Sequence, residues 1–139
     1  NGAIWNARTG ELVVELAPYQ WELFALKFSP DGRKLAGGSL GNTIHLWKVE
    51  TGEQILETQG HNSSVQDLAF SKNSRFLASA SNDHSLRFWR VSNGKEEGVF
   101  WGHQHSVLSV AISPDGTRLI SGGVDSVGYL WDFPNLDKF

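Results

Sequence analysis

Short apolar runs separated by polar turns dominate the chain. Residues 65–71, 76–81, 86–91 and 96–101 are each six or seven residues long and rich in aromatic and aliphatic side chains. Such runs are typical of buried strands. No window has the periodicity of an amphipathic helix. The pattern therefore predicts an all-β chain.

The same pattern predicts strands along the whole sequence. They are expected at 11–16; 24–29, 34–39, 43–49 and 53–58; 65–71, 76–81, 86–91 and 96–101; and 107–113, 118–123 and 127–133. Between them lie turn sequences such as SPDG at 29–32 and 113–116, together with TG and NG pairs whose Gly allows a positive φ. Short loops favour antiparallel meanders of four strands. One such sheet cannot cover both of its faces, so successive sheets should pack face to face.

A period of 42 residues organises these strands. It relates Trp5, Trp47, Trp89 and Trp131; His61 and His103; Gly10, Gly52 and Gly94; Ser29, Ser71 and Ser113; Leu35, Leu77 and Leu119; and Asp83 and Asp125. The spacing contains no insertion or deletion. Each copy is therefore expected to be one structural unit stacked on its neighbours.

The repeat resembles that of the WD-repeat β-propeller family. The likeness rests on the period, on Gly-His at 60–61 and 102–103, and on Leu-Trp-Asp at 130–132. It implies an all-β partial propeller of three blades of four antiparallel strands, belonging to one domain. In this division 1–18 ends a preceding blade and supplies its outer strand, 19–60 and 61–102 are repeats, and 103–139 is a repeat without its outer strand.

The resemblance also implies a structural hydrogen-bonded relay in two copies. Its members would be His61, Ser79, Asp83 and Trp89, and His103, Ser121, Asp125 and Trp131. The residue types suit this role. A buried indole N–H can only donate, a hydroxyl accepts and donates onward, and a His between hydroxyl and carboxylate satisfies both ring nitrogens.

The first full copy departs from this pattern. Its relay positions hold Tyr19, Gly37, Gly41 and Trp47, so aromatic packing is expected to replace the relay there. Trp21 has two interpretations: it covers the space left by Gly37, or it contacts a partner.

Composition narrows the function. A net charge of −3 and the absence of any Lys/Arg cluster along the sequence disfavour nucleic acid. No apolar run is long enough for a membrane span, and the first residues do not have the charged-then-apolar pattern of a signal peptide, so no membrane role is expected. The absence of Cys excludes disulfides and is compatible with a cytoplasmic protein. The absence of Met leads us to expect a sequence that was excerpted, processed or built from a longer chain.

Catalytic and metal-binding signals are weak, so the chain is predicted not to be an enzyme and to carry no cofactor or metal. His103 and His105 lack a third ligand at fixed spacing. Ser, His and Asp recur together in the expected relays, but there they should be buried, and no Gly-x-Ser-x-Gly elbow is present. The Gly-rich stretch 37–42 runs between strands and not into a helix, so it does not suggest a phosphate site.

The sequence favours the function of a protein–protein interaction scaffold. The resemblance places the loops of the two relays on one rim, where the partner-binding candidates are Trp21, Leu40, Asn62, Asn82, His84, Gln104, His105 and Val124. Leu40 and Val124 are notable because apolar loop tips have no evident core role. The alternative is an enzyme or small-ligand propeller that uses the central channel, where the polar candidates are Lys27, Gln66, Asp67 and Ser109.

Ring closure is the last expectation. Propellers have about four to eight blades, whereas this chain has three copies. Further blades from a longer parent chain, or a second copy of the chain, should complete the ring. In either case residues 11–16 are expected to pair with a third strand equivalent to 127–133, supplied by another chain or by further sequence.

Overall fold

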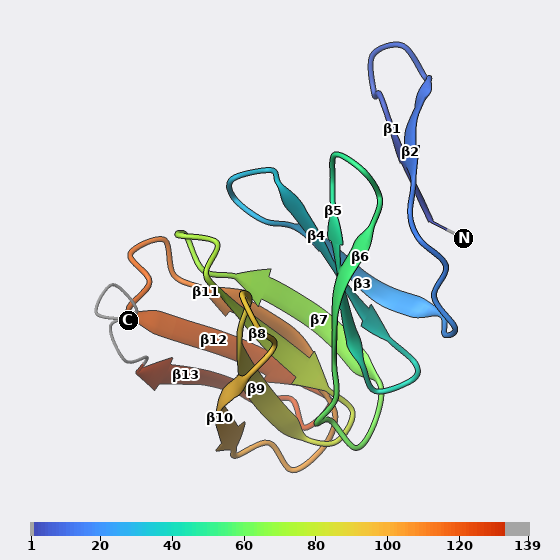
Figure 1. Cartoon of the computed structure of the whole chain (residues 1–139). Helices are drawn as coiled ribbons and strands as arrows, with labels where there is room; N and C mark the ends of the chain where they lie inside the picture. The colour runs from blue at the N-terminus through green and yellow to red at the C-terminus, as the bar shows by residue number, and fades with distance from the viewer. Residues whose placement is uncertain (1, 133–139) are drawn as a thin grey trace.

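All the regular structure within the described residues is β-sheet (Figure 1). A computed structural model describes residues 2–132. The strands are β1 (Ala3–Trp5), β2 (Leu12–Glu15), β3 (Leu23–Phe28), β4 (Lys34–Ser39), β5 (Ile44–Lys48), β6 (Gln54–Thr58), β7 (Val65–Phe70), β8 (Phe76–Ser81), β9 (Ser85–Arg90), β10 (Glu96–Trp101), β11 (Val107–Ile112), β12 (Arg118–Gly123) and β13 (Gly128–Asp132). Within the described residues, no helix is long and apolar enough to cross a membrane.

Successive strands pair as antiparallel meanders. Blade 1 contains β3–β6, blade 2 contains β7–β10 and blade 3 contains β11–β13, while β1 and β2 form a separate hairpin. The predicted all-β fold of four-stranded antiparallel blades in an unclosed propeller is confirmed. Observed strand ends differ from the predicted ones by one residue at several places, and predicted residue 133 lies outside the described residues.

The pairing of β2 differs from the expectation. Its residues pair with β1 of the same chain, in the register Ala3 with Glu15 and Ile4 with Val14. Trp5 is equivalent to Trp131, so β1 already occupies the third-strand position beside β2. The expectation that another chain or further sequence supplies this third strand is therefore wrong.

Side chains and backbone conformation both fix the turns between strands. Ser29 Oγ donates to Asp31 Oδ1 (2.6 Å) and accepts from the N–H of Lys34 (2.9 Å), which closes the turn between β3 and β4. In the second copy Ser74 takes the place of Gly and adopts φ 59°. Gly52, in the turn between β5 and β6, has φ 70°, the left-handed conformation that the sequence predicted there.

The hydrophobic core lies between successive blades. Ala36, Ile44 and Leu46 of blade 1 pack with Val65, Leu68 and Leu77 of blade 2. Ala78, Leu86 and Phe88 of blade 2 pack with Val107, Val110 and Leu119 of blade 3. The sheets thus bury their faces against each other, as the repeat requires.

A polar connection joins the three innermost strands. Lys27 Nζ of β3 lies 3.2 Å from Asp67 Oδ1 of β7. The other oxygen of Asp67 accepts the N–H of Val110 in β11 (3.1 Å). One carboxylate therefore links all three blades.

The meander separates the loops into two rims. Because consecutive strands alternate in direction, loops 17–22, 40–43, 59–64, 82–84, 102–106 and 124–127 lie at one end of the blades, which we call the relay rim. Loops 29–33, 49–53, 71–75, 91–95 and 113–117 lie at the other end, which we call the turn rim.

Candidate functional site

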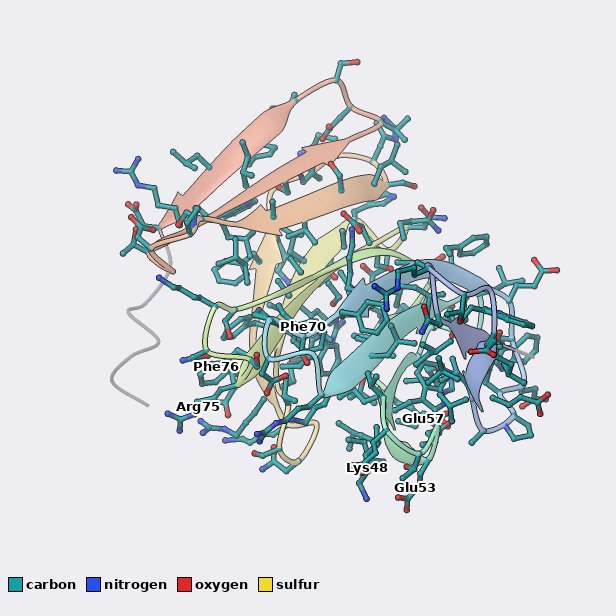
Figure 2. All side chains as sticks on the ribbon, turned by 90° about the horizontal axis from the view of Figure 1, so that it is seen from above. Lys48, Glu53, Glu57, Phe70, Arg75 and Phe76 are labelled. Atoms are coloured by element: carbon teal, nitrogen blue, oxygen red, sulfur yellow. The ribbon has the colours of Figure 1, made fainter. Side chains whose placement is uncertain are left out.

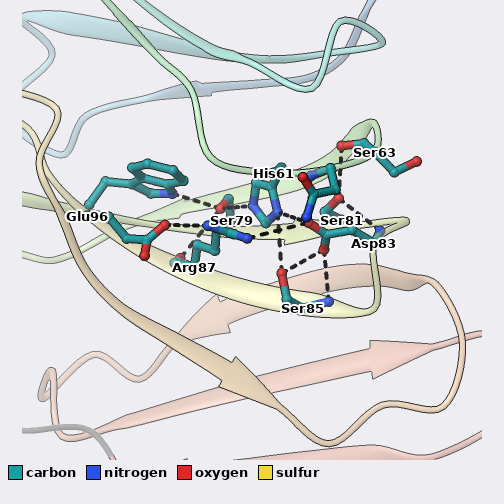
Figure 3. Close-up of polar contacts among 10 residues, drawn as sticks. His61, Ser63, Ser79, Ser81, Asp83, Ser85, Arg87 and Glu96 are labelled. Atoms are coloured by element: carbon teal, nitrogen blue, oxygen red, sulfur yellow. Dashed lines mark hydrogen bonds and ion pairs between the residues drawn. The ribbon is translucent and has the colours of Figure 1, made fainter.

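A chain of hydrogen bonds joins two loops and two strands of blade 2 (Figure 3). Trp89 Nε1, in β9, donates to Ser79 Oγ of β8 (2.8 Å). Ser79 Oγ lies 2.7 Å from His61 Nε2. His61 Nδ1 lies 2.8 Å from Asp83 Oδ2. The structure therefore brings together the four residues that the resemblance to the WD-repeat family implied as one relay.

The indole of Trp89 determines which atom donates in each hydrogen bond of the relay. Trp89 can only donate, so Ser79 Oγ accepts from it and its own O–H points to His61 Nε2. The His61 proton is then on Nδ1 and faces the carboxylate of Asp83. His61 and Ser79 are 6% and 0% exposed. The relay atoms of Trp89, Ser79 and His61 each have a partner, so the Ser79 hydroxyl is not free to act as a nucleophile.

Asp83 anchors both relay-rim loops of blade 2. Its Oδ2 accepts the N–H of Asn62 (3.0 Å), and its Oδ1 accepts the hydroxyl of Ser85 (2.6 Å). Burial raises the pKa of Asp83, but the hydrogen bonds from His61, Ser85 and Asn62 outweigh burial and hold this pKa well below its usual value. The carboxylate therefore stays charged and holds loop 82–84 against loop 59–64.

Blade 3 repeats this arrangement. Trp131 Nε1 donates to Ser121 Oγ (2.9 Å), which lies 2.9 Å from His103 Nε2. His103 Nδ1 lies 2.9 Å from Asp125 Oδ2, which also accepts the N–H of Gln104 (3.0 Å). Burial raises the pKa of Asp125, and the bonds from Gln104 and His103 outweigh it, so the pKa is lowered. Two adjacent blades thus hold their rim loops in the same way.

Aromatic packing replaces the relay in blade 1. Trp47 is fully buried, and its Nε1 has no hydrogen-bond partner within residues 2–132. Its ring lies where a serine would project, since a Cβ on Gly37 would be 2.9 Å from Trp47 Cζ3. Tyr19 packs edge-on against the same ring, with centroids 5.6 Å apart. Loop 17–22 is therefore held by ring contacts.

Blade 1 also contains a buried polar cluster that the sequence analysis missed. His45 Nε2 lies 2.9 Å from Thr43 Oγ1, which lies 2.8 Å from Ser39 Oγ. All three side chains are buried. The repeat gave no signal for this cluster because His45 aligns with Arg87 and Tyr129.

We expect His45 to make blade 1 sensitive to mild acid. Burial lowers the pKa of His45 and outweighs the opposing effects of Glu57 and Gln54. The unfolded chain therefore binds this proton at higher pH than the folded chain, so stability is complete above about pH 6.5 and falls as the pH drops below it. His45→Phe removes this titration and retains an aromatic ring against Trp47. Urea unfolding between about pH 7 and pH 5 should give a flatter stability profile for the variant; identical slopes would contradict the assignment.

The packing of Trp21 contradicts the first of the two interpretations given for this residue. A Cβ on Gly41 would overlap the indole of Trp21, so the ring lies on Gly41. The space beside Gly37 is filled by Trp47 and Leu23. The interpretation that Trp21 covers Gly37 is therefore wrong. The side chain remains 46% exposed.

The other partner-binding candidates lie on the relay rim. Those with exposed side chains are Trp21, Leu40, Asn62, His84, Gln104, His105 and Val124. Asn82 is the exception, because it is half-buried and its Nδ2 donates to Ser64 Oγ (2.9 Å). Asn82 thus has a structural bond within blade 2, which makes it the least available of the set.

Two pairs of these candidates come close together. The N–H of Leu40 donates to the carbonyl of Glu22 (2.8 Å), which joins the two rim loops of blade 1 that carry Leu40 and Trp21. Across the junction of blades 2 and 3, the rings of His84 and His105 lie edge-on with centroids 6.1 Å apart. The rim therefore has an apolar pair on blade 1 and an imidazole pair between blades 2 and 3.

The polar candidates of the channel strands are largely engaged in other contacts. Lys27 and Asp67 pair with each other, and Gln66 Nε2 donates to Ser64 Oγ (3.0 Å). Residues 2–132 contain no cluster of three or more His, Asp or Glu side chains suited to a metal ion. Among the described residues, three of the four channel candidates, Lys27, Gln66 and Asp67, thus already have polar partners.

A family model described as "WD domain, G-beta repeat" matches the chain three times, over residues 10–48, 52–90 and 94–132. The chain belongs to the WD40 family. Each WD40 match begins just before the outer strand of one blade and ends at the third strand of the next. WD40 repeats are generally protein-interaction scaffolds and are typically non-enzymatic. A comparison with curated proteins found no match.

Proposed function

We propose that the chain is part of a protein-interaction scaffold that receives a protein partner on its relay rim. The observation that carries this proposal is the contrast between fixed backbone and exposed side chains. Asp83 and Asp125 hold the loops through backbone N–H groups, whereas His84, His105 and Val124 beside them remain exposed. A rim held in this way loses little entropy on binding.

The chemistry of this rim favours a protein partner with apolar side chains. Trp21, Leu40 and Val124 are 46%, 45% and 57% exposed, and Trp is among the residues that contribute most at interfaces. The six relay-rim loops contain neither Lys nor Arg. A nucleic-acid backbone would therefore find no cation there.

The test compares the proteins that a relay-rim variant captures with those that a control variant captures. Trp21→Ser combined with Leu40→Ser should lose specific partners from a cell lysate. Ile55→Ser removes an exposed apolar side chain from β6, outside the relay rim, and should retain them. Quantitative mass spectrometry of the captured proteins gives the measurement. Equal capture by all three proteins, or equal loss in both variants, would oppose the proposal.

We also propose that further blades, from a longer parent chain or a second copy, cover the two outer blade faces. Leu26 and Phe28 are 51% and 57% exposed on blade 1, and Ile120 and Leu130 are 52% and 60% exposed on blade 3. Exposed apolar faces of this kind favour association.

A further inference from the structure

Two imidazole side chains meet on the relay rim at the junction of blades 2 and 3. His84 lies in loop 82–84, between β8 and β9, and His105 lies in loop 102–106, between β10 and β11. Both residues are exposed. Their rings lie edge-on, with centroids 6.1 Å apart. The packing of one blade on the next therefore brings together two His residues from separate loops.

These are the only exposed imidazoles among the residues that the structure describes. The sequence contains five His residues, all of them within 2–132. The other three, His45, His61 and His103, are buried. The sequence analysis considered His103 together with His105, but both ring nitrogens of His103 have partners in the relay of blade 3. The imidazole that lies next to His105 is instead that of His84.

The two relays hold the backbone beside each ring. Asp83, the residue before His84, belongs to the relay of blade 2. The N–H of Gln104, the residue before His105, donates to Asp125 of the relay of blade 3 (3.0 Å). The two loops are therefore fixed before any ligand arrives, and side chains on fixed backbone lose little freedom when they close on a ligand.

The repeat does not require imidazoles at these two positions. The residues 42 positions earlier, at the junction of blades 1 and 2, are Asn42 and Ser63. Asn42 and His84 share a left-handed backbone, with φ 67° and 71°. The equivalent residue of blade 3, Ser126, has φ 62°. The same loop thus forms with three different side chains, and the imidazole pair is a feature of one junction.

Two neighbouring exposed imidazoles suit a transition-metal ion. Neutral ring nitrogens bind Zn²⁺ at about 2.0–2.1 Å, and a tetrahedral ion then places the centroids of two bound rings about 5 Å apart. The separation of 6.1 Å between His84 and His105 exceeds this by about 1 Å. Exposed side chains cover such a distance by small rotations. One ion can therefore lie between the two loops.

The remaining His outside the relays does not offer a competing site. His45 Nδ1 lies 3.8 Å from Glu57 Oε2, and Figure 2 labels Glu57, which belongs to β6 of blade 1. His45 Nδ1 is buried and has no hydrogen-bond partner within residues 2–132. A hydrated ion cannot reach a nitrogen that is closed off from solvent, so Glu57 provides a control and not a second site.

We infer that His84 and His105 form one half of a transition-metal site, for an ion of the Zn²⁺ class, and that a side chain of a protein partner completes it. Residues 2–132 contain no group of three or more His, Asp or Glu side chains placed to hold an ion. Two of the four positions of a tetrahedral ion are thus left for ligands from outside the chain. A His, Asp or Glu of the partner takes such a position and ties the partner to the relay rim. This completion rests on the proposed function, whereas ion binding by the chain alone does not.

The first test is isothermal titration calorimetry of the full 139-residue chain with ZnCl₂, in which one ion per chain is expected. His84→Asn and His105→Ser introduce the residues of the other junction, so both variants should keep the parent's melting temperature. Each should weaken Zn²⁺ binding at least about tenfold. Glu57→Gln should bind Zn²⁺ as the parent does. MgCl₂ should give no comparable heat, because Mg²⁺ prefers oxygen ligands.

Nuclear magnetic resonance identifies the ligands directly. Zn²⁺ should change the ring signals of His84 and His105 and leave those of the buried His residues unchanged. Zn²⁺ binding that survives both substitutions, an equal loss in Glu57→Gln, or equal binding of Mg²⁺ would reveal an adventitious ion only and would overturn the inference.

The second test uses N-acetylhistidine in place of the partner's side chain. Its ring signals should change when it is mixed with the Zn²⁺-loaded chain. They should not change with the metal-free chain, or with the His84→Asn, His105→Ser double variant at the same Zn²⁺ concentration. An unchanged spectrum with the loaded chain would contradict completion by a partner. Capture through Trp21 and Leu40 is measured separately, so that result would leave the proposed function standing.

Discussion

Replacing Trp89 by Phe is expected to destabilise the protein by on the order of 1–3 kcal/mol. The change removes the indole N–H that donates to Ser79 Oγ (2.8 Å) and leaves a buried hydroxyl without its donor. It also shortens a side chain that is only 2% exposed, which adds a packing loss. Urea unfolding at neutral pH, followed by tryptophan fluorescence and circular dichroism, measures the loss.

The chain contains a matched control for this change. Trp47 occupies the same repeat position and is as deeply buried, yet its Nε1 has no hydrogen-bond partner within residues 2–132. Trp47→Phe therefore loses packing but no hydrogen bond, and it removes an unsatisfied donor. The loss for Trp89→Phe should exceed that for Trp47→Phe by on the order of 1 kcal/mol. Equal losses would mean that the relay of blade 2 contributes no hydrogen-bond energy.

The spacing of the sequence located the strands because the repeat is regular. A 42-residue period without insertions fixes the same meander three times, so turns such as SPDG and the apolar runs identify strand ends to within one or two residues. The positions of His61 and Asp83 were found in the same way. Each recurs in the next copy, at His103 and Asp125, which singled them out, and the resemblance to the WD-repeat family assigned them to a relay.

Features that do not recur were missed. His45 has no equivalent in the other copies, so its contact with Thr43 could be found only from the structure. Trp21 was singled out correctly as unusual, but sequence alignment could not decide between Gly37 and Gly41 as the residue beneath its ring. That choice depends on the path of loop 17–22. Because the residues of this loop do not match those of the other copies, the repeat does not determine that path.

The gathering of cationic side chains at the turn-rim end of the junction between blades 1 and 2 was also outside the reach of sequence reasoning. No Lys/Arg cluster stands out along the chain, because Lys34, Arg75 and Arg90 come from three separate segments. They meet only because one blade packs on the next. Charge counted along a sequence therefore underestimates charge gathered at a blade junction.

The 139-residue chain alone is expected to associate through its two open blade faces. On β3, Leu26 and Phe28 are 51% and 57% exposed, whereas on blade 2 the repeat equivalent of Leu26, Leu68, is fully buried against blade 1 and that of Phe28, Phe70, is half-buried. On blade 3, Leu130 is 60% exposed, whereas its equivalent Phe88 is 4% exposed against blade 3. Burying each large apolar side chain contributes about 1.5–3 kcal/mol, so covering both faces should strongly favour association.

Contacts between the blade 3 face of one copy and the blade 1 face of another would imitate the internal junctions. Such an interface joins two different surfaces, so blocking either one should prevent it. Phe28→Lys and Leu130→Lys are each expected to shift the sedimentation equilibrium toward the monomer. Each single change should lower the binding of a hydrophobic dye, and the double change should lower it further. Val124 is an exposed apolar residue on the relay rim, and Val124→Lys should leave association unchanged. A longer chain whose further blades cover both faces should be monomeric without any substitution. A 139-residue protein that remains monomeric at high concentration and binds no dye would show that neither face needs a cover.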